Sequence, residues 1–279
     1  MQRIRDPRDA AEVFGEALPI LTVEEARPDL PGEPTLEGAR CALQSLELAT
    51  GLARSGAARG LVTGPVCKSQ LYAVGFNHPG QTEFIAERCG VAHDNAVMLL
   101  AGPQLKVVPV TTHVPLAEVP RLLSIEMIVA KGRATARGLQ KNFKIEEPRL
   151  AFAGFNPHAG EDGTIGREEI DLLHPAIAQL RSEGIDASGP YAADTMFHAR
   201  AREQYDVAVC LYHDQALIPL KTLAFDEGVN MTLGLPLVRT APDHGTAFDI
   251  AGRGAAHPGA MIAAIKMATA ASDARACEG

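Results

Sequence analysis

Short apolar runs alternate along this chain with longer segments in which apolar residues recur every three or four positions. Short runs closed by glycine or proline are typical of buried strands, and the longer spacing is typical of helices with one apolar face. The pattern predicts strands at residues 59–63, 105–112, 150–155 and 207–212. It predicts helices over residues 36–53, 116–143 (with a break) and 167–182.

The alternation of strands and helices decides the expected fold class. Strands separated by helices form βαβ units, which build a mainly parallel sheet covered by helices on both faces. The chain has 279 residues, which suffices for one large domain or two medium ones and for a sizeable buried core. We therefore expect an α/β protein.

Composition narrows the function classes. The chain carries 26 basic and 34 acidic residues, a net charge of −8, without a basic tail, so nucleic acid is not expected as the main partner. The five cysteines are dispersed and none has CxxC spacing, which suits a reducing compartment and gives no sign of a zinc ribbon. No apolar run reaches the length of a membrane span. We expect a cytoplasmic protein that does not cross a membrane.

Three histidines directly follow predicted strands. They are His113, His158 and His213, 45 and 55 residues apart. Parallel strands bring their carboxyl ends to one edge of a sheet, and ligands bind there. Three imidazoles at that edge would suit zinc or another divalent metal with positions left open for substrate. The alternative is that they are unrelated polar residues of strand-end loops. Asp214, beside the third histidine, is either its hydrogen-bond partner or a helix N-cap.

Other polar segments carry candidate ligand-binding groups. The chain lacks the GxGxxG fingerprint of simple dinucleotide folds, but residues 243–254 form a segment of small residues through which backbone can approach a ligand. Such a segment can also serve only as a turn. Lys221, Asn230 and Arg239 follow at nine-residue spacings and suit a phosphate or carboxylate, unless they are solvated surface. Thr82 stands at a predicted helix start, where it is an anion contact or a plain N-cap.

A series of motifs gives the chain a resemblance to a known family, the PdxA family of 4-hydroxythreonine-4-phosphate dehydrogenases in pyridoxal phosphate biosynthesis. The series covers residues 60 to 260 in order. The motifs are LVTGPVCK (61–68), HPGQTEF (78–84), TTHVPL (111–116), NPHAGEDG (156–163), REEID (167–171), ADTMF (193–197), YHDQALIPLK (212–221), GVNMTLGLP (228–236) and RTAPDHGTAFDIAGRG (239–254). The last segment also resembles the nucleotide-binding segment of isocitrate and isopropylmalate dehydrogenases.

The resemblance implies a fold and an assembly. The fold is a three-layer α/β/α arrangement with two subdomains, like isocitrate and isopropylmalate dehydrogenases. We expect residues 1–84 with 228–279 on the nucleotide side and residues 85–227 on the metal and dimer side. The family is a homodimer, and its metal lies at the dimer interface, where the partner subunit gives the third histidine.

The resemblance also implies roles for particular residues. The family's metal ligands, which would hold zinc, magnesium or cobalt, fall on the three histidines already named. Substrate contacts fall on Gln81, Thr82, Lys221, Asn230 and Arg239. NAD or NADP contacts fall within the last motif, on His244, Gly245, Thr246, Ala247 and Asp249.

The implied reaction is oxidation of the C3 hydroxyl of 4-phosphohydroxy-L-threonine by NAD(P). The β-keto acid then loses CO₂ and leaves 3-amino-2-oxopropyl phosphate. The metal would act as a Lewis acid at the hydroxyl and at the enolate. Lys221 and Asp194 are the candidates for the base that takes the hydroxyl proton.

The chain departs from the family pattern at two places. Gln81 stands where the family has a histidine, and a glutamine cannot carry charge. If that position faces phosphate, its loss weakens binding by about 1.5–3 kcal/mol, unless the nearby His78 substitutes. The family also opens with a strand and a Gly/Pro-rich turn that this chain does not show. Without that first βα unit, we expect an exposed sheet edge and a cleft with one wall missing.

Two other functions remain open. One is a dehydrogenase of the same fold that acts on another phosphorylated hydroxy acid or on a dihydrodiol dicarboxylate, which Gln81 would fit. The other is a non-catalytic remnant that binds a metal or ligand, against which the intact set of histidines argues.

Overall fold

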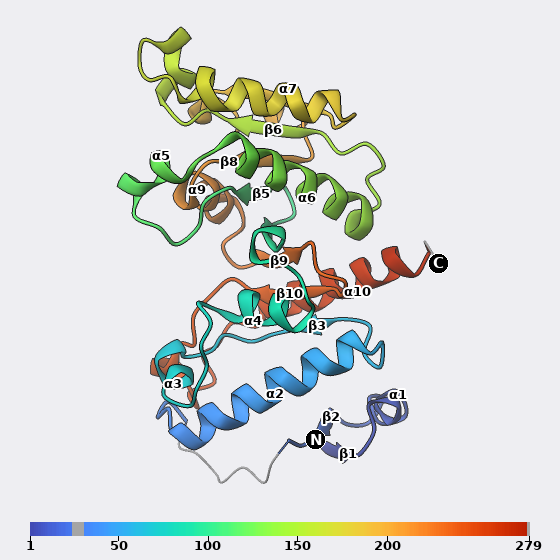
Figure 1. Ribbon diagram of the computed structural model, residues 1–279. Helices are drawn as coiled ribbons and strands as arrows, with labels where there is room; N and C mark the ends of the chain where they lie inside the picture. The colour runs from blue at the N-terminus through green and yellow to red at the C-terminus, as the bar shows by residue number, and fades with distance from the viewer. Residues whose placement is uncertain (24–30, 278–279) are drawn as a thin grey trace.

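The computed structural model describes residues 1–23 and 31–277, and its main feature is an eight-stranded sheet (Figure 1). The strand order is β3-β10-β9-β4-β5-β8-β6-β7. The strands are β3 (Leu61–Val62), β4 (Val97–Ala101), β5 (Lys106–Pro109), β6 (Leu150–Ala153), β7 (Ala187–Tyr191), β8 (Val207–Cys210), β9 (Val229–Leu233) and β10 (Arg239–Pro242).

The sheet is mostly parallel, as expected, with an antiparallel centre. Four neighbouring pairs are parallel, β3 with β10 and the run β5, β8, β6, β7. Three are antiparallel, and all of them involve β4 or β9. Two of these pairs are joined by short connections, residues 102–105 and 234–238, which are too short for a parallel crossover.

The four strands expected from the apolar runs are confirmed as β3, β5, β6 and β8. Strands β5, β6 and β8 are buried along nearly their whole length, as strands covered on both faces should be. The apolar pattern did not mark β4, β7, β9 and β10. Among these, β10 (Arg-Thr-Ala-Pro) contains no long apolar run from which a strand could be read.

The expected helices are present. Two of them begin at a side-chain cap: Thr35 accepts a hydrogen bond from the Gly38 amide at 3.0 Å, and Ser124 accepts one from the Met127 amide at 3.2 Å. The third, expected at 167–182, has no side-chain cap and begins with a π-helical turn, Glu169–Leu173. The expected break in residues 116–143 lies at Leu123, whose backbone is extended. The helices are α1 (Ala10–Val13), α2 (Leu36–Arg54), α3 (Lys68–Tyr72), α4 (Gln81–Arg88), α5 (Val119–Leu122), α6 (Ile125–Phe143), α7 (His174–Ser182), α8 (Ala199–Arg202), α9 (His213–Ala224) and α10 (Gly259–Ala276).

Helices pack on this sheet in groups. Helix α6 contacts both α7 and α10, whereas α9 packs on β5 and β8 (Figure 1). The buried apolar residues form two clusters. The larger one surrounds β4, β5, β6 and β8, and the smaller one lies among α2, α3 and α4. The limits of the expected subdomains remain a prediction, and residues 24–30 and 278–279 of the expected nucleotide side lie outside the described part of the chain.

The N-terminal segment forms a small unit of its own. Strands β1 (Gln2–Ile4) and β2 (Pro19–Leu21) pair in parallel, separately from the main sheet. Strand β3 is an edge strand whose neighbour in the sheet is β10. Within the described ranges, no helix is long and apolar enough to cross a membrane.

Candidate active site

The three strand-end histidines follow neighbouring strands. Strands β5, β8 and β6 lie side by side and run parallel, so their carboxyl ends share one edge. His113 follows β5, His213 opens α9 directly after β8, and His158 lies in the turn η4 (Pro157–Gly163) after β6. This is the placement that the sequence predicted for a site at the sheet edge.

Two of the three histidines come together. The ring centroids of His113 and His213 are 5.6 Å apart, and both rings line a cavity of about 230 Å³. Burial lowers the pKa of His113, and the neighbouring Lys68 and His213 lower it further. His113 therefore carries a neutral imidazole near neutral pH, which is the form that binds a metal.

His158 does not join this pair. Its side chain is 62% exposed and its Nδ1 lies 2.8 Å from Glu161 Oε1. The residues that the structure describes contain no group of three or more His, Cys, Asp or Glu side chains that could hold a metal ion. The chain thus presents a two-histidine corner and, separately, a third histidine that is exposed.

The chemistry of these donors fits a divalent metal. His213 Nδ1 is 2.7 Å from Asp214 Oδ1, and the start of α9 has no side-chain cap, so Asp214 is the partner of His213 and not the N-cap. His158 has the same arrangement with Glu161. A carboxylate at Nδ1 fixes the ring and leaves Nε2 for the metal. Imidazole with open positions suits zinc and related divalent ions.

Gln215 anchors this corner and was not picked out by sequence reasoning. Its buried Oε1 accepts a hydrogen bond from the Leu211 amide at 2.7 Å, and its Nε2 donates to the Gly154 carbonyl at 2.7 Å. The side chain therefore ties the start of α9 to the ends of β8 and β6. The signal for it in the sequence was its position inside the motif YHDQALIPLK (212–221).

A second polar cluster surrounds Arg239, at the start of β10. The guanidinium is buried and donates to the hydroxyls of Thr63 at 2.9 Å, Thr232 at 3.3 Å and Thr82 at 3.4 Å. Burial lowers the pKa of Arg239 to about 10, so the group stays charged at neutral pH. Thr82 and Arg239, both expected as substrate contacts, are thus in contact with each other.

Several buried atoms of this region have no hydrogen-bond partner within residues 1–23 and 31–277. They include Nε of Arg239, Oδ1 of Asn230 and Oε1 of Gln81. Buried polar atoms are nearly always paired in native proteins, so an unpaired N–H of the charged Arg239 guanidinium points to a ligand-binding site. An anion such as phosphate or carboxylate would satisfy the donor and the charge together.

Lys221 and Asp194, the two candidate bases, lie in different surroundings. Lys221 Nζ donates to the Asp243 carbonyl at 2.9 Å and is 2.7 Å from Asp243 Oδ2. Asp194 is exposed in the turn η6 (Ala193–Thr195), where it contributes, after Glu161, to the raised pKa of His158. Lys221 must leave Asp243 and lose its own proton before its amine can act as a base.

The position of Gln81 bears on the first departure from the family pattern. Its Nε2 donates to the Gly64 carbonyl at 3.0 Å. His78, the suggested substitute, has Nε2 2.8 Å from Glu87 Oε2 and a ring packed beside Phe76 and Phe84. His78 is thus engaged by Glu87 and by two phenylalanine rings.

Two charged residues that sequence reasoning did not select link the two clusters. Glu83 acts on both Arg239 and His113, raising the pKa of each, and Lys68 acts on His113 in the opposite direction. Both come close to Gly80, where an added Cβ would lie 3.0 Å from Glu83 Oε2 and 3.9 Å from Lys68 Nζ. Their only signal was that they lie inside two of the quoted motifs.

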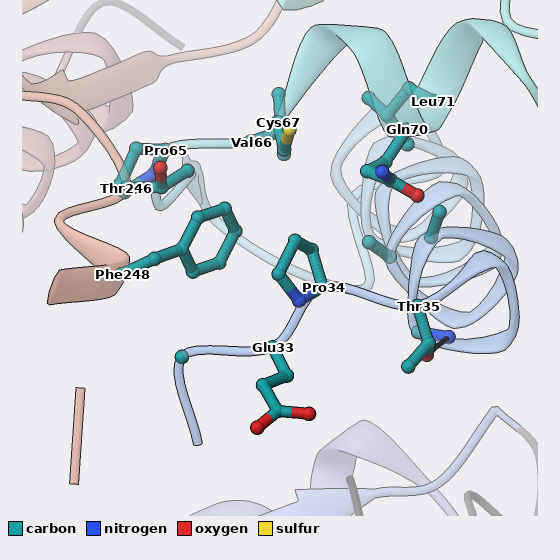
Figure 2. A pocket seen from close by; sticks show the side chains of 14 residues that line it. Glu33, Pro34, Thr35, Pro65, Val66, Cys67, Gln70, Leu71, Thr246 and Phe248 are labelled. Atoms are coloured by element: carbon teal, nitrogen blue, oxygen red, sulfur yellow. Dashed lines mark hydrogen bonds between the residues drawn. The ribbon is translucent and has the colours of Figure 1, made fainter. Parts of the chain in front are cut away.

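The segment expected to bind nucleotide separates two cavities. Thr246 and Phe248 line one of about 340 Å³, in which the Phe248 ring faces Pro34 and Pro65 (Figure 2). His244, Gly245 and Ala247 line the other, of about 430 Å³. Asp249 lies in the short turn Phe248–Ile250 and is exposed. Both volumes fall in the usual range for small-molecule sites.

Comparison with known proteins shows the family to which the chain belongs. The family model described as pyridoxal phosphate biosynthetic protein PdxA matches residues 1–268. The chain belongs to this family. PdxA proteins take part in pyridoxal phosphate biosynthesis, and relatives of this chain at 50–58% identity are named as dehydrogenases, which are oxidoreductases.

Three comparisons give the extent of the similarity. The 4-hydroxythreonine-4-phosphate dehydrogenase of Erythrobacter litoralis is 58% identical over 268 residues, 96% of this chain and 80% of that protein. The crystal structure of the Klebsiella pneumoniae enzyme of the same name has a TM-score of 0.86 at 35% identity, covering 97% and 81% of the two chains. A terephthalate 1,2-cis-dihydrodiol dehydrogenase of Burkholderia xenovorans gives a TM-score of 0.67 at 30% identity, covering 92% and 81%.

Proposed function

We propose that this PdxA protein oxidises 4-phosphohydroxy-L-threonine at C3 with NAD or NADP, and that the product decarboxylates to 3-amino-2-oxopropyl phosphate. The names of its relatives support the substrate. The observation that carries the proposal is the buried guanidinium of Arg239, with an unpaired Nε, together with the adjacent imidazoles of His113 and His213. Glu83 acts electrostatically on both Arg239 and His113, which supports their belonging to one site.

The metal site proposed is shared between two copies of the chain. His113 and His213 of one subunit would hold the ion together with His158 of a second copy in a homodimer. The outward orientation of His158 supports this division. A bound zinc, magnesium or cobalt ion supplies Lewis acidity, which favours loss of the hydroxyl proton and stabilises negative charge after decarboxylation.

The chain's own residues would then bind and orient the substrate. Arg239 and Thr82 would hold an anionic group, and Asn230 offers an unpaired acceptor to a hydroxyl or ammonium. As an ammonium, Lys221 would bind the anion; to take the hydroxyl proton it would first have to lose its own proton and leave Asp243. Asp194 is the alternative base. Gln81 would contribute at most a neutral hydrogen bond.

The nicotinamide cofactor would lie along the segment that contains His244, Gly245, Thr246, Ala247 and Asp249. The cavities on either side of this segment support that placement. In this proposal residues 1–84 with 228–279 form the nucleotide side, and residues 85–227 carry the metal and dimer contacts. A cytoplasmic location also remains a prediction.

A second substrate class is supported by one neighbour. The Burkholderia xenovorans protein is named for a dihydrodiol substrate, and Gln81 removes a cationic group that a phosphate would favour. Substrate competition separates the two. A phosphate-specific enzyme turns over the phosphorylated amino acid, is inhibited by other phosphate esters and ignores a dihydrodiol dicarboxylate. Turnover of the dihydrodiol with no inhibition by phosphate esters would overturn the first proposal.

Complementation of inactive variants tests the shared metal site. His113→Ala and His158→Ala should each be inactive, and a mixture that exchanges subunits should regain activity, because one of the two sites in each hybrid dimer keeps all three histidines. A mixture as inactive as its components would contradict a site shared between copies.

A further inference from the structure

A buried carboxylate lies beneath the turn that carries His158. Glu169 is 2% exposed. Its Oε1 accepts a hydrogen bond from the Asn156 amide at 2.7 Å, and its Oε2 accepts one from Asn156 Nδ2 at 2.9 Å. No basic side chain in the described part of the chain pairs with it. Burying a carboxylate costs free energy of folding unless well-placed hydrogen bonds compensate for the loss of water.

The turn above this carboxylate has an unusual backbone. Five successive residues, 158 to 162, have φ between 41° and 79°. Four of them, His158, Ala159, Glu161 and Asp162, have side chains, for which this left-handed region is strained. Strain of this kind persists only where the surrounding structure imposes it, and it concentrates at functional sites.

Glu169 is the group placed to impose this conformation. The backbone of the turn packs directly on its carboxylate, because a Cβ added to Gly160 would lie 2.6 Å from Glu169 Oε2. The same carboxylate holds Asn156, the residue that precedes the turn, by both main chain and side chain. The start and the middle of the turn are therefore both fixed relative to one buried side chain.

A second carboxylate locks the orientation of the Asn156 amide. Glu168 Oε2 accepts from Asn156 Nδ2 at 2.7 Å, so that nitrogen points to two carboxylates at once. The amide cannot flip, because Oδ1 would then face both acceptors. A glutamine at position 169 could still accept from the Asn156 main chain, but its own NH₂ would then oppose Nδ2.

We propose that Glu169 is a positioning residue that holds the left-handed turn so that His158 projects out of its own subunit, toward the metal corner of a second copy. The proposal rests on the proposed function for the role of His158. Glu169 is not among the residues proposed to bind the metal or the substrate. It acts through the conformation of residues 157–163.

The test compares Glu169→Gln with the matched control Glu168→Gln in the full chain. Glu168 bonds to the same amide but is only partly buried, so a glutamine there can turn into solvent. Co²⁺ is the probe, titrated by its absorbance. We expect Glu169→Gln to weaken Co²⁺ binding by about 10–100-fold, the usual effect of losing an orienting partner. We expect Glu168→Gln to change it by less than about threefold, and phosphate binding to stay at its original strength in both variants.

Hydrogen exchange of residues 157–163 gives an independent readout. The amides of the turn should exchange faster in Glu169→Gln, while those of β6 and α7 keep their rates. Unchanged Co²⁺ affinity in a folded Glu169→Gln protein would overturn the proposal. If the unaltered protein binds no Co²⁺, the proposed metal site fails. The positioning role of Glu169 is then tested by hydrogen exchange alone. Faster exchange confined to residues 157–163 in Glu169→Gln supports that role, and unchanged exchange refutes it.

Discussion

Replacing Arg239 should change anion binding strongly and the free energy of unfolding only a little. The guanidinium is buried and donates to three threonine hydroxyls, so it places a charge in the interior, on which the carboxylate of Glu83 acts electrostatically. Arg239→Met keeps an apolar stem of similar length and removes that charge. We expect the substitution to remove anion binding while leaving the fold almost as stable as before.

The magnitudes follow from the contacts. Losing three hydrogen bonds to hydroxyls costs on the order of 1–3 kcal/mol each where the donor is charged. Removing the buried charge stabilises the folded state by several kcal/mol, because its desolvation cost disappears. The unfolding free energy should therefore change by less than about 2 kcal/mol. Each charge-assisted bond lost to a phosphate weakens binding by about 1.5–3 kcal/mol, or roughly 10–150-fold in Kd.

Thermal unfolding with and without inorganic phosphate measures both effects. A ligand at about 100 times its Kd stabilises the folded state by about 2.7 kcal/mol, so phosphate should raise the Tm of the unaltered protein and not that of Arg239→Met. Arg149→Met is the control, because Arg149 pairs with Asp206 at 3.0 Å away from the site. It should keep the response to phosphate. A full response in Arg239→Met, or a loss of stability above about 3 kcal/mol, would refute the reasoning.

Three further substitutions test other residues. Gln81→His should lower KM for a phosphorylated substrate by about tenfold or more, because an imidazolium adds a charge-assisted hydrogen bond; an unchanged KM would show that position 81 does not contact phosphate. Asp214→Asn should weaken Zn²⁺ binding about 10–100-fold in a chelator competition, since His213 loses its carboxylate partner; equal affinities would remove Asp214 from the site. Asp206→Asn should lower stability near neutral pH. Burial alone would raise the pKa of Asp206, but hydrogen bonds from Arg149 outweigh it and leave the pKa below 3.8. The stabilisation is therefore present above that pH and lost below it, and urea unfolding should separate variant and unaltered protein at pH near 6 but not near 2.

Sequence patterns predicted the elements of the fold better than their pairing. Runs such as Leu150–Ala153 are apolar because the strand is buried on both faces, and that is visible in residue types. The antiparallel centre depends on the connections 102–105 and 234–238, which set direction through their length and not through an apolar pattern. Strand β10 carries a buried arginine, which a hydropathy pattern assigns to the surface.

The candidate site was partly predictable for similar reasons. The approach of His113 and His213 follows from two adjacent parallel strands, so strand ends sufficed to expect it. The orientation of His158 depends on a left-handed turn, and the handedness of four residues with side chains cannot be read from their types. The buried state of Glu169 is likewise a product of tertiary packing over Gly160.

Reduction of NAD or NADP on addition of 4-phosphohydroxy-L-threonine tests the proposed activity most directly. The assay uses the purified chain with zinc, magnesium or cobalt added, and then with a chelator. The predicted result is reduced cofactor formed with a phosphorylated substrate, lost on chelation, and absent in His113→Ala. Turnover that survives the chelator, or no turnover of this substrate by a folded dimer loaded with metal, would contradict the proposed function.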